Sequence, residues 1–332
     1  MSLPQRALGR TGLRVSALGF GCGNIGGLLI RGTPAERERA VARAMELGIN
    51  YFDTAAIYGD GQSEQNLGQV LQALKARVYV GTKVRVPAVA AGEIPAAVTR
   101  GLEESLRRLR MERVDLFQLH NRITTEREAR TLSAKDVRDA VVPALARLVE
   151  QGKIGFYGIT ALGDTPALLD VLDTGAVHTA QVCFNLLNPT AEHAPPSGFP
   201  AQDFGRLLVR CRERRTGAIV IRVLAGGALS GEDARHPVAA PQVDPIGTSP
   251  DYAVDVRHAR ALKALVDEHH AESLVEASLR FALTSEAVST VLLGYSSLDH
   301  LEGAAAAVAK GPLSPEAQAR LEACWAELAR TR

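Results

Sequence analysis

The chain has 332 residues, of which 46% are hydrophobic and 23% are charged. This balance is typical of globular proteins and too apolar for a disordered one. Its 38 basic and 37 acidic residues leave a net charge of +1, so no overall field draws the chain to nucleic acid or anionic lipid. No apolar run reaches 18 residues, and the amino-terminal residues lack the apolar segment of a secretory signal. We therefore expect a cytoplasmic protein without nucleic-acid or membrane partners, and the sequence leaves its oligomeric state open.

The cysteines and histidines give no sign of a disulfide framework or a metal site. The four cysteines lie far apart, without the spacing of a metal or redox pair: Cys22, Cys183, Cys211 and Cys324. In a chain of this length they predict reduced thiols. His269 and His270 are adjacent and would face different ways on a helix, so we expect no metal ligands there.

Short β-rich runs alternate with amphipathic helical patterns along nearly the whole chain. Strands are predicted at about 15–20, 49–53, 78–83, 114–120, 154–159, 179–184, 217–224 and 287–293. Helices are predicted at about 33–47, 63–76, 95–109, 135–151, 165–173, 203–215, 255–270, 272–283, 298–309 and 315–330. Most strand runs are continuously apolar, as in a parallel sheet that is covered on both faces.

Eight such strand and helix units favour a closed (β/α)8 TIM barrel over a doubly wound sheet. The chain contains no low-complexity linker, so residues 1–332 are predicted to form one domain. The start, RALGRTGLRVSALG, places a turn between two short apolar runs and predicts an N-terminal β-hairpin on the barrel floor. Helix 315–330 would be an extra C-terminal helix. Long irregular segments at 121–134, 186–202 and 230–252 each follow a strand, on the face that carries the chemistry in such barrels.

Residues 21–26, GCGNIG, match the spelling of a dinucleotide-binding fingerprint. That motif must open a helix directly after its strand, so that the helix amino end can hold the pyrophosphate. Here the next helix begins only at Thr33-Pro34, and Gly27 and the polar Arg31-Gly32 pair lie between it and the motif. We therefore interpret the segment as a glycine-rich loop that a ligand can approach closely.

Four reactive side chains stand at the ends of successive predicted strands. Asp53, Lys83 and His120 end the second, third and fourth strands, and Tyr58 lies in the loop after the second. In a (β/α)8 barrel all four would enter one bowl. Each has an ordinary structural explanation: a turn cap, a rim aromatic, a buried ion pair or a core histidine. Their joint placement favours catalysis.

The segment GINYFDTAAIYGDGQSEQNLGQVL resembles the signature of the aldo-keto reductases. The Thr82-Lys83 pair, DLFQLH at 115–120, LGRTGLRVSALGFG, LAGGALSG and LLGYSSLDHL are also similar to members of this family. The resemblance spans about residues 6–303. It implies a nicotinamide-dependent carbonyl reductase or alcohol dehydrogenase on a (β/α)8 barrel, with Asp53, Tyr58, Lys83 and His120 as its catalytic residues.

These four side chains could support reduction of a carbonyl, which needs a hydride from a cofactor and a proton for the oxygen. Tyr58 is the candidate proton donor, and a Lys83 cation would stabilise its phenolate. Asp53 would hold the ammonium in place. His120 would offer a ring N–H to the substrate oxygen. In the reverse direction, tyrosinate would be the base that oxidises an alcohol.

The implied cofactor residues depart from the family pattern in several places. Thr160-Ala161 stands where members usually have Ser-Asn, Ile221 stands where an aromatic ring commonly stacks on the nicotinamide, and His300 replaces a frequent 2′-phosphate arginine. Gln181 matches the family. The predicted set is Gly21, Cys22, Gly23, Asp53, Thr160, Gln181, Ile221, Arg222, Leu224, Gly226, Gly294, Ser297 and His300. NADP and NAD both remain possible cofactors.

Arg222 is unusual because it interrupts an apolar strand run, where a guanidinium is costly to desolvate without an anionic partner. One interpretation is a structural pair with an internal carboxylate. The other is that it holds the cofactor pyrophosphate, together with backbone N–H groups of Gly226-Gly227.

The leading hypothesis is thus an NAD(P)-dependent oxidoreductase acting on a small carbonyl compound, a sugar or an alcohol. A second is a nicotinamide-sensing binding protein with slow turnover, which the altered residues at 160–161 and 221 favour. A third is a Schiff-base aldolase using Lys83. The loops after the strands would set the substrate, which the sequence does not identify.

Overall fold

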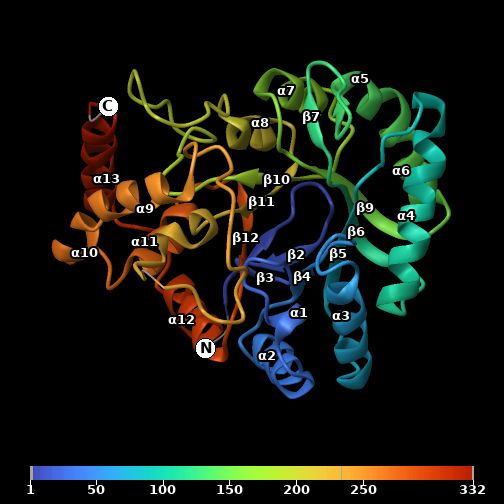
Figure 1. Cartoon of the computed structure of the whole chain (residues 1–332), viewed down its shortest axis with the longest axis horizontal. Coiled ribbons are helices and arrows are strands. Elements are labelled where there is room, and N and C mark those ends of the chain that lie inside the picture. The colour runs from blue at the N-terminus through green and yellow to red at the C-terminus, as the bar shows by residue number, and fades with distance from the viewer. Residues whose placement is uncertain (1–2, 233, 331–332) are drawn as a thin grey trace.

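The computed structural model describes residues 3–232 and 234–330. Eight parallel strands close into a barrel because the last of them pairs with the first. In barrel order they are β3 (Leu18–Gly21), β4 (Tyr51–Asp53), β5 (Tyr79–Val84), β6 (Val114–Leu119), β9 (Ile154–Thr160), β10 (Thr179–Cys183), β11 (Gly217–Ile221) and β12 (Val288–Gly294). The predicted (β/α)8 barrel is confirmed (Figure 1). We call the end formed by the carboxyl ends of these strands the mouth of the barrel.

Helices follow the strands and surround the barrel (Figure 1). They are α2 (Pro34–Glu46), α3 (Gln62–Ala73), α4 (Ile94–Leu109), α6 (Val142–Glu150), α7 (Thr165–Asp173), α8 (Leu207–Glu213), α11 (Leu274–Ala282) and α12 (Leu298–Ala309), with α13 (Pro315–Leu328) as the extra C-terminal helix. The predicted start of α2 is confirmed: Thr33 and Glu36 cap each other reciprocally, and Pro34 opens the first turn. No helix among the described residues is long and apolar enough to cross a membrane.

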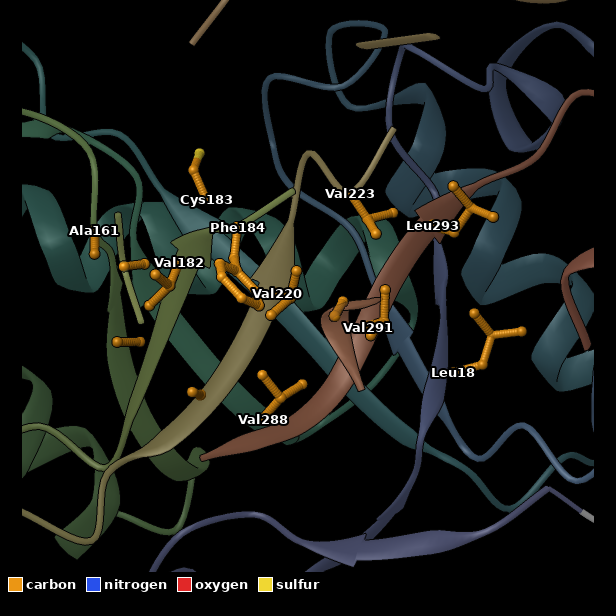
Figure 2. Packing of buried hydrophobic residues seen from close by; sticks show 14 of the residues in the cluster. Leu18, Ala161, Val182, Cys183, Phe184, Val220, Val223, Val288, Val291 and Leu293 are labelled. Atoms are coloured by element: carbon orange, nitrogen blue, oxygen red, sulfur yellow. The ribbon is translucent and has the colours of Figure 1, made fainter. Parts of the chain in front are cut away.

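Side chains alternate along each strand between the helices and the barrel interior. Outward-facing residues such as Val182, Val220 and Val291, on three neighbouring strands, join a large apolar layer beneath the helices (Figure 2). A smaller cluster fills the lower interior of the barrel and consists of Leu8, Val15, Tyr51, Leu116 and Ile219. The polar residues of the candidate site lie above this smaller cluster, toward the mouth.

The N-terminal hairpin supplies part of that lower cluster. Strands β1 (Gln5–Ala7) and β2 (Arg14–Ser16) pair antiparallel, and Leu8 and Val15 pack against the strand residues of the floor. The prediction of one strand over 15–20 was wrong, because it joined β2 to β3. The chain bends between them, where the Ser16 hydroxyl donates to the carbonyl of Leu18 at 2.7 Å.

Several predicted elements are shorter than expected or divided. Strand 217–224 ends at Ile221, because Arg222 has a left-handed φ of 58°. Helix 203–215 begins only at Leu207, since Phe204 N–H is held by the Thr190 hydroxyl at 2.8 Å. Helix 255–270 is divided into α9 (Tyr252–Ala261) and α10 (Ala264–Asp267). Helix 135–151 contains a π-turn before Pro143, which has no N–H to donate.

Short elements that the sequence pattern did not predict lie in the connecting segments. They are α1 (Leu28–Arg31), η1 (Ala91–Glu93), β7 (Arg122–Thr124), β8 (Thr131–Ser133), α5 (Ala134–Asp136), the π-helix η2 (Val137–Val141) and the 3-10 helix η3 (Ala225–Ser230). Strands β7 and β8 pair with each other within the predicted loop 121–134. That loop thus gains a fixed shape directly beside the barrel mouth.

Candidate active site

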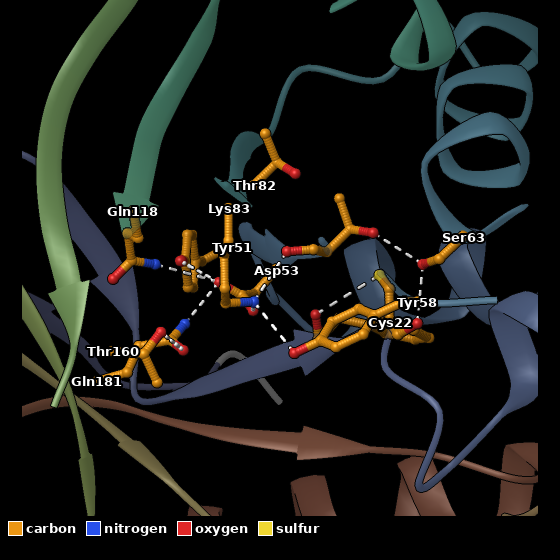
Figure 3. Close-up of polar contacts among 12 residues, drawn as sticks. Cys22, Tyr51, Asp53, Tyr58, Ser63, Thr82, Lys83, Gln118, Thr160 and Gln181 are labelled. Atoms are coloured by element: carbon orange, nitrogen blue, oxygen red, sulfur yellow. Dashed lines mark hydrogen bonds and ion pairs between the residues drawn. The ribbon is translucent and has the colours of Figure 1, made fainter. Parts of the chain in front are cut away.

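Asp53, Lys83 and Tyr58 converge at the mouth of the barrel, as predicted from the strand ends. Asp53 ends β4, and β5 runs beside it with Lys83 near its own end. The Lys83 ammonium pairs with the Asp53 carboxylate and donates hydrogen bonds to the Thr54 carbonyl at 2.8 Å and the Tyr58 hydroxyl at 3.3 Å (Figure 3). Asp53 and Lys83 are each only 1% exposed, so this ion pair is almost completely removed from water.

Three further donors hold the Asp53 carboxylate from inside the barrel. The Tyr51 hydroxyl donates to Asp53 Oδ2 at 2.9 Å, Gln181 Nε2 at 2.8 Å and Gln118 Nε2 at 3.4 Å. All three side chains are buried. Burial and the neighbouring Asp53 raise the pKa of Tyr51 well above its ordinary value, so its hydroxyl keeps the proton that it donates.

This arrangement keeps Lys83 charged. Burial on its own lowers the pKa of a lysine, because it disfavours the ammonium. The Asp53 carboxylate and the Tyr58 hydroxyl together more than offset this effect, so the pKa of Lys83 lies above its usual range. A cation therefore stands directly beside the Tyr58 hydroxyl, with Nζ 4.8 Å from the centre of the ring.

His120 follows β6 and faces the same tyrosine. The two rings meet edge to face with their centres 5.8 Å apart. Burial, Lys83 and Arg85 together lower the pKa of His120 well below its usual range, so the imidazole is neutral. Its buried Nδ1 has no hydrogen-bond partner among the described residues. A proton on Nε2 avoids burying an unpaired donor at Nδ1, and it leaves an N–H on the other side of the ring.

The loops after β3 and β4 hold Tyr58 in place. The Asn24 side chain accepts a hydrogen bond from Gly59 N–H at 3.1 Å, and the backbone of Gly23 lies against the Tyr58 ring. The Ser63 hydroxyl donates to the Cys22 carbonyl and contacts the Thr54 hydroxyl, both at 2.8 Å. These hydrogen bonds join the two loops, so the backbone that carries Tyr58 is held in position.

A cavity of about 490 Å³ lies beyond the ends of β11, β12 and β3, and the four predicted catalytic residues are not part of its lining. Five predicted cofactor residues line it: Arg222, Leu224, Gly226, Gly294 and His300. A second hollow of about 420 Å³ shares part of this lining and continues along α12. Gly226 and Gly227 have positive φ angles of 71° and 111°, a backbone shape that side chains other than glycine adopt only with strain.

The segment between η3 and α9 forms part of the wall of this cavity. Arg235 donates to the Ala240 carbonyl at 2.6 Å, the Gly226 carbonyl at 2.8 Å and the Tyr252 hydroxyl at 3.0 Å. Ala240 N–H in turn donates to the Ile25 carbonyl at 3.1 Å. The loop after β11 is therefore tied to the loop after β3, across the cavity.

The prediction that Arg222 lies within a strand was wrong, since β11 ends at the preceding residue. Its guanidinium donates to the Asp244 carbonyl at 2.9 Å, and no ion pair with a carboxylate is present within the described residues. Burial lowers its pKa without removing its charge. The guanidinium therefore lines the cavity with donors left over.

The remaining predicted cofactor residues are not part of the lining of these two hollows. Cys22 is buried, its thiol faces the Phe20 carbonyl, and burial raises the pKa of that thiol. Thr160 is buried beside Gln181, with 3.5 Å between Oγ1 and Oε1. Ser297 caps α12 by accepting from His300 N–H at 3.2 Å. Ile221 ends β11 half-buried.

The glycine-rich loop serves close packing of two backbones. A Cβ on Gly21 would lie 2.9 Å from the Leu293 carbonyl oxygen, and one on Gly26 would lie 2.3 Å from Gly294 and Tyr295 backbone atoms. These glycines let the loop after β3 rest on the end of β12. Because the strands form a closed barrel, GCGNIG is not the fingerprint of a doubly wound dinucleotide-binding fold.

All four cysteines are free and buried. Within the ranges that the structure describes, no three His, Cys, Asp or Glu side chains gather as a metal site would require.

The sequence analysis missed several residues of the site. Tyr51 stands two residues before Asp53 on β4, and the two-residue period of a strand could have placed it on the same face. Gln118 precedes His120 by the same interval. Arg235 and Tyr252 carry no such signal, because Arg235 reaches the cavity from an irregular segment and Tyr252 from the first residue of α9.

Comparisons with known proteins agree with this architecture. The family model described as "Aldo/keto reductase family" matches residues 17–326. The chain is 30% identical over 311 residues to L-galactose dehydrogenase of Arabidopsis thaliana, covering 91% of this chain and 87% of that protein. It is 26% identical over 331 residues to pyridoxal 4-dehydrogenase of Microbacterium luteolum, covering 90% of each.

Solved structures share the fold. An aldo-keto reductase from Bacillus halodurans in its holo form superposes with a TM-score of 0.73 at 24% identity, covering 99% of this chain and 97% of its own. Glycerol dehydrogenase of Gluconobacter oxydans gives a TM-score of 0.75 at 23% identity with the same coverage. With a family model that matches nearly the whole sequence, this chain belongs to the aldo/keto reductase family, a family of oxidoreductases that act on carbonyl compounds or sugars.

Proposed function

We propose that the protein is an NAD(P)-dependent oxidoreductase that reduces a small aldehyde or ketone, or oxidises a sugar or alcohol in the reverse direction. One observation carries the proposal: the Tyr58 hydroxyl lies 3.3 Å from a buried, charged lysine. The Tyr58 ring also meets a neutral histidine ring edge to face. A phenol, a cation and an N–H donor around one point suit transfer of a proton to a carbonyl oxygen as that oxygen gains charge.

Each residue has a distinct task in this proposal. Tyr58 gives its proton to the carbonyl oxygen, and takes it back when an alcohol is oxidised. Lys83 stabilises the phenolate that remains, and Asp53 holds the ammonium in position. His120 orients the substrate oxygen through its Nε2–H. The bound nicotinamide coenzyme would supply or accept the hydride.

The cavity beyond the ends of β11, β12 and β3 fits the coenzyme. Arg222 and Arg235 bring guanidinium groups to its wall, and guanidinium geometry suits phosphate oxygens. Gly226 and Gly227 expose backbone there without side chains. These features match the pyrophosphate, which NAD and NADP have in common. His300 also lines the cavity, and burial lowers its pKa, so it offers no full charge for a 2′-phosphate at neutral pH.

The state of Lys83 argues against an aldolase. Schiff-base chemistry needs a neutral amine as the nucleophile, whereas this lysine is held as an ammonium by its buried carboxylate partner. Borohydride added with a carbonyl substrate should therefore leave the protein mass unchanged.

A panel of aldehydes, ketones, sugars and alcohols, assayed with NAD(H) and NADP(H), tests the proposal. Stopped-flow absorbance should show rapid oxidation of bound NADH or NADPH by at least one carbonyl class. If coenzyme binds but no carbonyl or alcohol changes its redox state above the rate in free solution, the protein is a nicotinamide-binding sensor and the proposal is wrong.

A further inference from the structure

Two arginines stand at the mouth beside the candidate catalytic residues, and the proposed mechanism does not use them. Arg85 follows β5, two residues beyond Lys83, and Arg122 opens β7, two residues beyond His120. His120 N–H donates to the Val84 carbonyl at 2.8 Å. The Asn121 side chain bonds both N–H and C=O of Val86 at 2.8 Å. The chain segments that carry the two arginines therefore run next to each other directly beyond the strand ends.

Neither guanidinium is neutralised. Both side chains are exposed, and in the part of the chain that the structure describes neither has an ion pair or a hydrogen bond. Nearby carboxylates are engaged elsewhere: Asp164 accepts from Thr125 N–H at 2.9 Å, and Asp136 accepts from Ser133 and pairs with Arg127. Two like charges on adjacent segments repel each other unless an anion lies between them.

Their charges reach the interior of the mouth. Arg85 contributes, after burial and Lys83, to the low pKa of His120. Burial raises the pKa of Cys183, at the end of β10, to about 12, and Arg122 is among the charges that oppose this rise. The charges of both arginines therefore act on groups at the mouth of the barrel, although the whole chain is nearly neutral.

The position of the pair separates it from the coenzyme cavity. That cavity lies on the β11, β12 and β3 side, whereas the arginines follow β5 and β6. In barrel order Tyr58, after β4, stands between the two regions. A ligand that extends from Tyr58 toward the arginines therefore leads away from the coenzyme, as a substrate would.

We propose that Arg85 and Arg122 bind an anionic group of the substrate, a phosphate or a carboxylate, so that the substrates are short anionic aldehydes or ketones. This inference rests on the proposed function, since it takes Tyr58 and His120 as the place of the carbonyl. Two residues of extended chain rise by about 7 Å, which puts the anion a few carbon atoms from the carbonyl. Paired guanidinium groups suit both phosphate and carboxylate oxygens.

Matched substrates test the inference. Glyceraldehyde 3-phosphate is compared with glyceraldehyde, and succinic semialdehyde with butanal, in wild type, Arg85→Ala, Arg122→Ala and the double variant. Wild type should favour an anionic member in kcat/KM by about 10-fold or more, the low end for hydrogen bonds to charged groups. Each variant should lose that preference while its kcat/KM for the neutral member changes by less than about 2-fold. If the variants lose the preference for glyceraldehyde 3-phosphate, the bound group is a phosphate. If they lose the preference for succinic semialdehyde, it is a carboxylate.

Arg130→Ala is the matched control, because Arg130 is exposed on the same loop and should leave the preference intact. The inference is overturned if wild type treats both members of each pair alike, or if Arg130→Ala loses the preference as the other variants do. Calorimetric binding of glycerol 3-phosphate and of succinate gives a readout without turnover. Binding that the double variant abolishes supports the anion site even if no aldehyde is reduced, in which case only the proposed function fails. Absence of both binding and preference overturns the inference itself.

Discussion

Lys83 carries a full charge in a place that is almost free of water, and its neighbours explain how. A buried cation without a partner would lose its proton or destabilise the fold. Asp53 supplies the opposite charge, and Tyr51, Gln181 and Gln118 satisfy the carboxylate from below. Residues on three other strands, β4, β6 and β10, thus fix the Lys83 ammonium, which also donates to the Tyr58 hydroxyl.

Replacing this lysine should change the pH dependence of catalysis. In Lys83→Met no cation stabilises the tyrosinate, so the pH at which alcohol oxidation reaches half of its plateau should move upward. The variant leaves Asp53 buried without its partner, which should cost about 3–5 kcal/mol in the free energy of unfolding. Urea unfolding establishes that the variant is folded under assay conditions. A pH profile that falls in height while its limbs stay in place would contradict the coupling.

Arg222 offers a second test at the residue scale. If its guanidinium binds the coenzyme pyrophosphate, Arg222→Ala should weaken binding of NADH or NADPH by about 1.5–3 kcal/mol, and Arg222→Lys should also weaken it. Fluorescence titration of the reduced coenzyme measures this without turnover. The bond to the Asp244 carbonyl allows a structural role instead. A lower melting temperature of the free protein, with coenzyme affinity unchanged, would establish that role and refute ours.

At the scale of elements, helix α3 connects strand β5 to the outer layer. Its Glu64 is fully buried, accepts from the Thr82 hydroxyl at 2.5 Å and pairs with Arg108 at 2.5 Å. Thr82 immediately precedes Lys83, so this carboxylate fixes the strand that carries the proposed catalytic cation.

Loss of Glu64 should therefore be costly. Glu64→Ala leaves the mostly buried Arg108 and the Thr82 hydroxyl without their acceptor, and should lower the free energy of unfolding by about 3 kcal/mol. The exposed pair of Arg43 and Glu302 is the control: Glu302→Ala should cost less than about 1 kcal/mol. Urea denaturation of both variants makes the comparison, and equal losses would disprove the structural role given to Glu64.

The sequence predicted most elements because long periodic or apolar runs determine them locally. It erred where an apolar run contains a bend, as after Ser16, or a left-handed residue, as at Arg222, since the hydrophobic pattern reports neither. The strand-end residues could be placed in advance because a parallel barrel brings those ends together. That Arg85 and Arg122 lack partners could not be predicted, because it depends on where every neighbouring carboxylate points.

For the whole molecule, histidines that the fold keeps neutral should set the response to mild acid. Burial lowers the pKa of five of the eight histidines: His120, His178, His193, His258 and His300. Below about pH 6.5 the unfolded chain binds protons that the folded chain does not. Stability should therefore fall as pH decreases from about 7.5 to 5.5.

Urea midpoints across this range measure the effect. His193, among the rings of Phe184, Phe281 and Trp325, can be replaced by Gln to remove one titrating group and reduce the slope. The exposed His269→Gln is the control. A stability that is constant or increases toward pH 5.5 would show that these histidines are not held neutral. A single transition in each curve is also expected if residues 1–332 form one domain, which stays a prediction.

The central claim is that Tyr58 exchanges the proton with the substrate, and Tyr58→Phe tests it most directly. This change removes one hydroxyl and keeps the ring that packs against Gly23 and His120. Single-turnover oxidation of bound NADH or NADPH by the best carbonyl substrate should slow by about 10²–10⁴-fold, while coenzyme affinity by fluorescence titration stays within about 2-fold of wild type. A variant that retains more than half of the wild-type rate, with coenzyme bound equally well, would contradict the account.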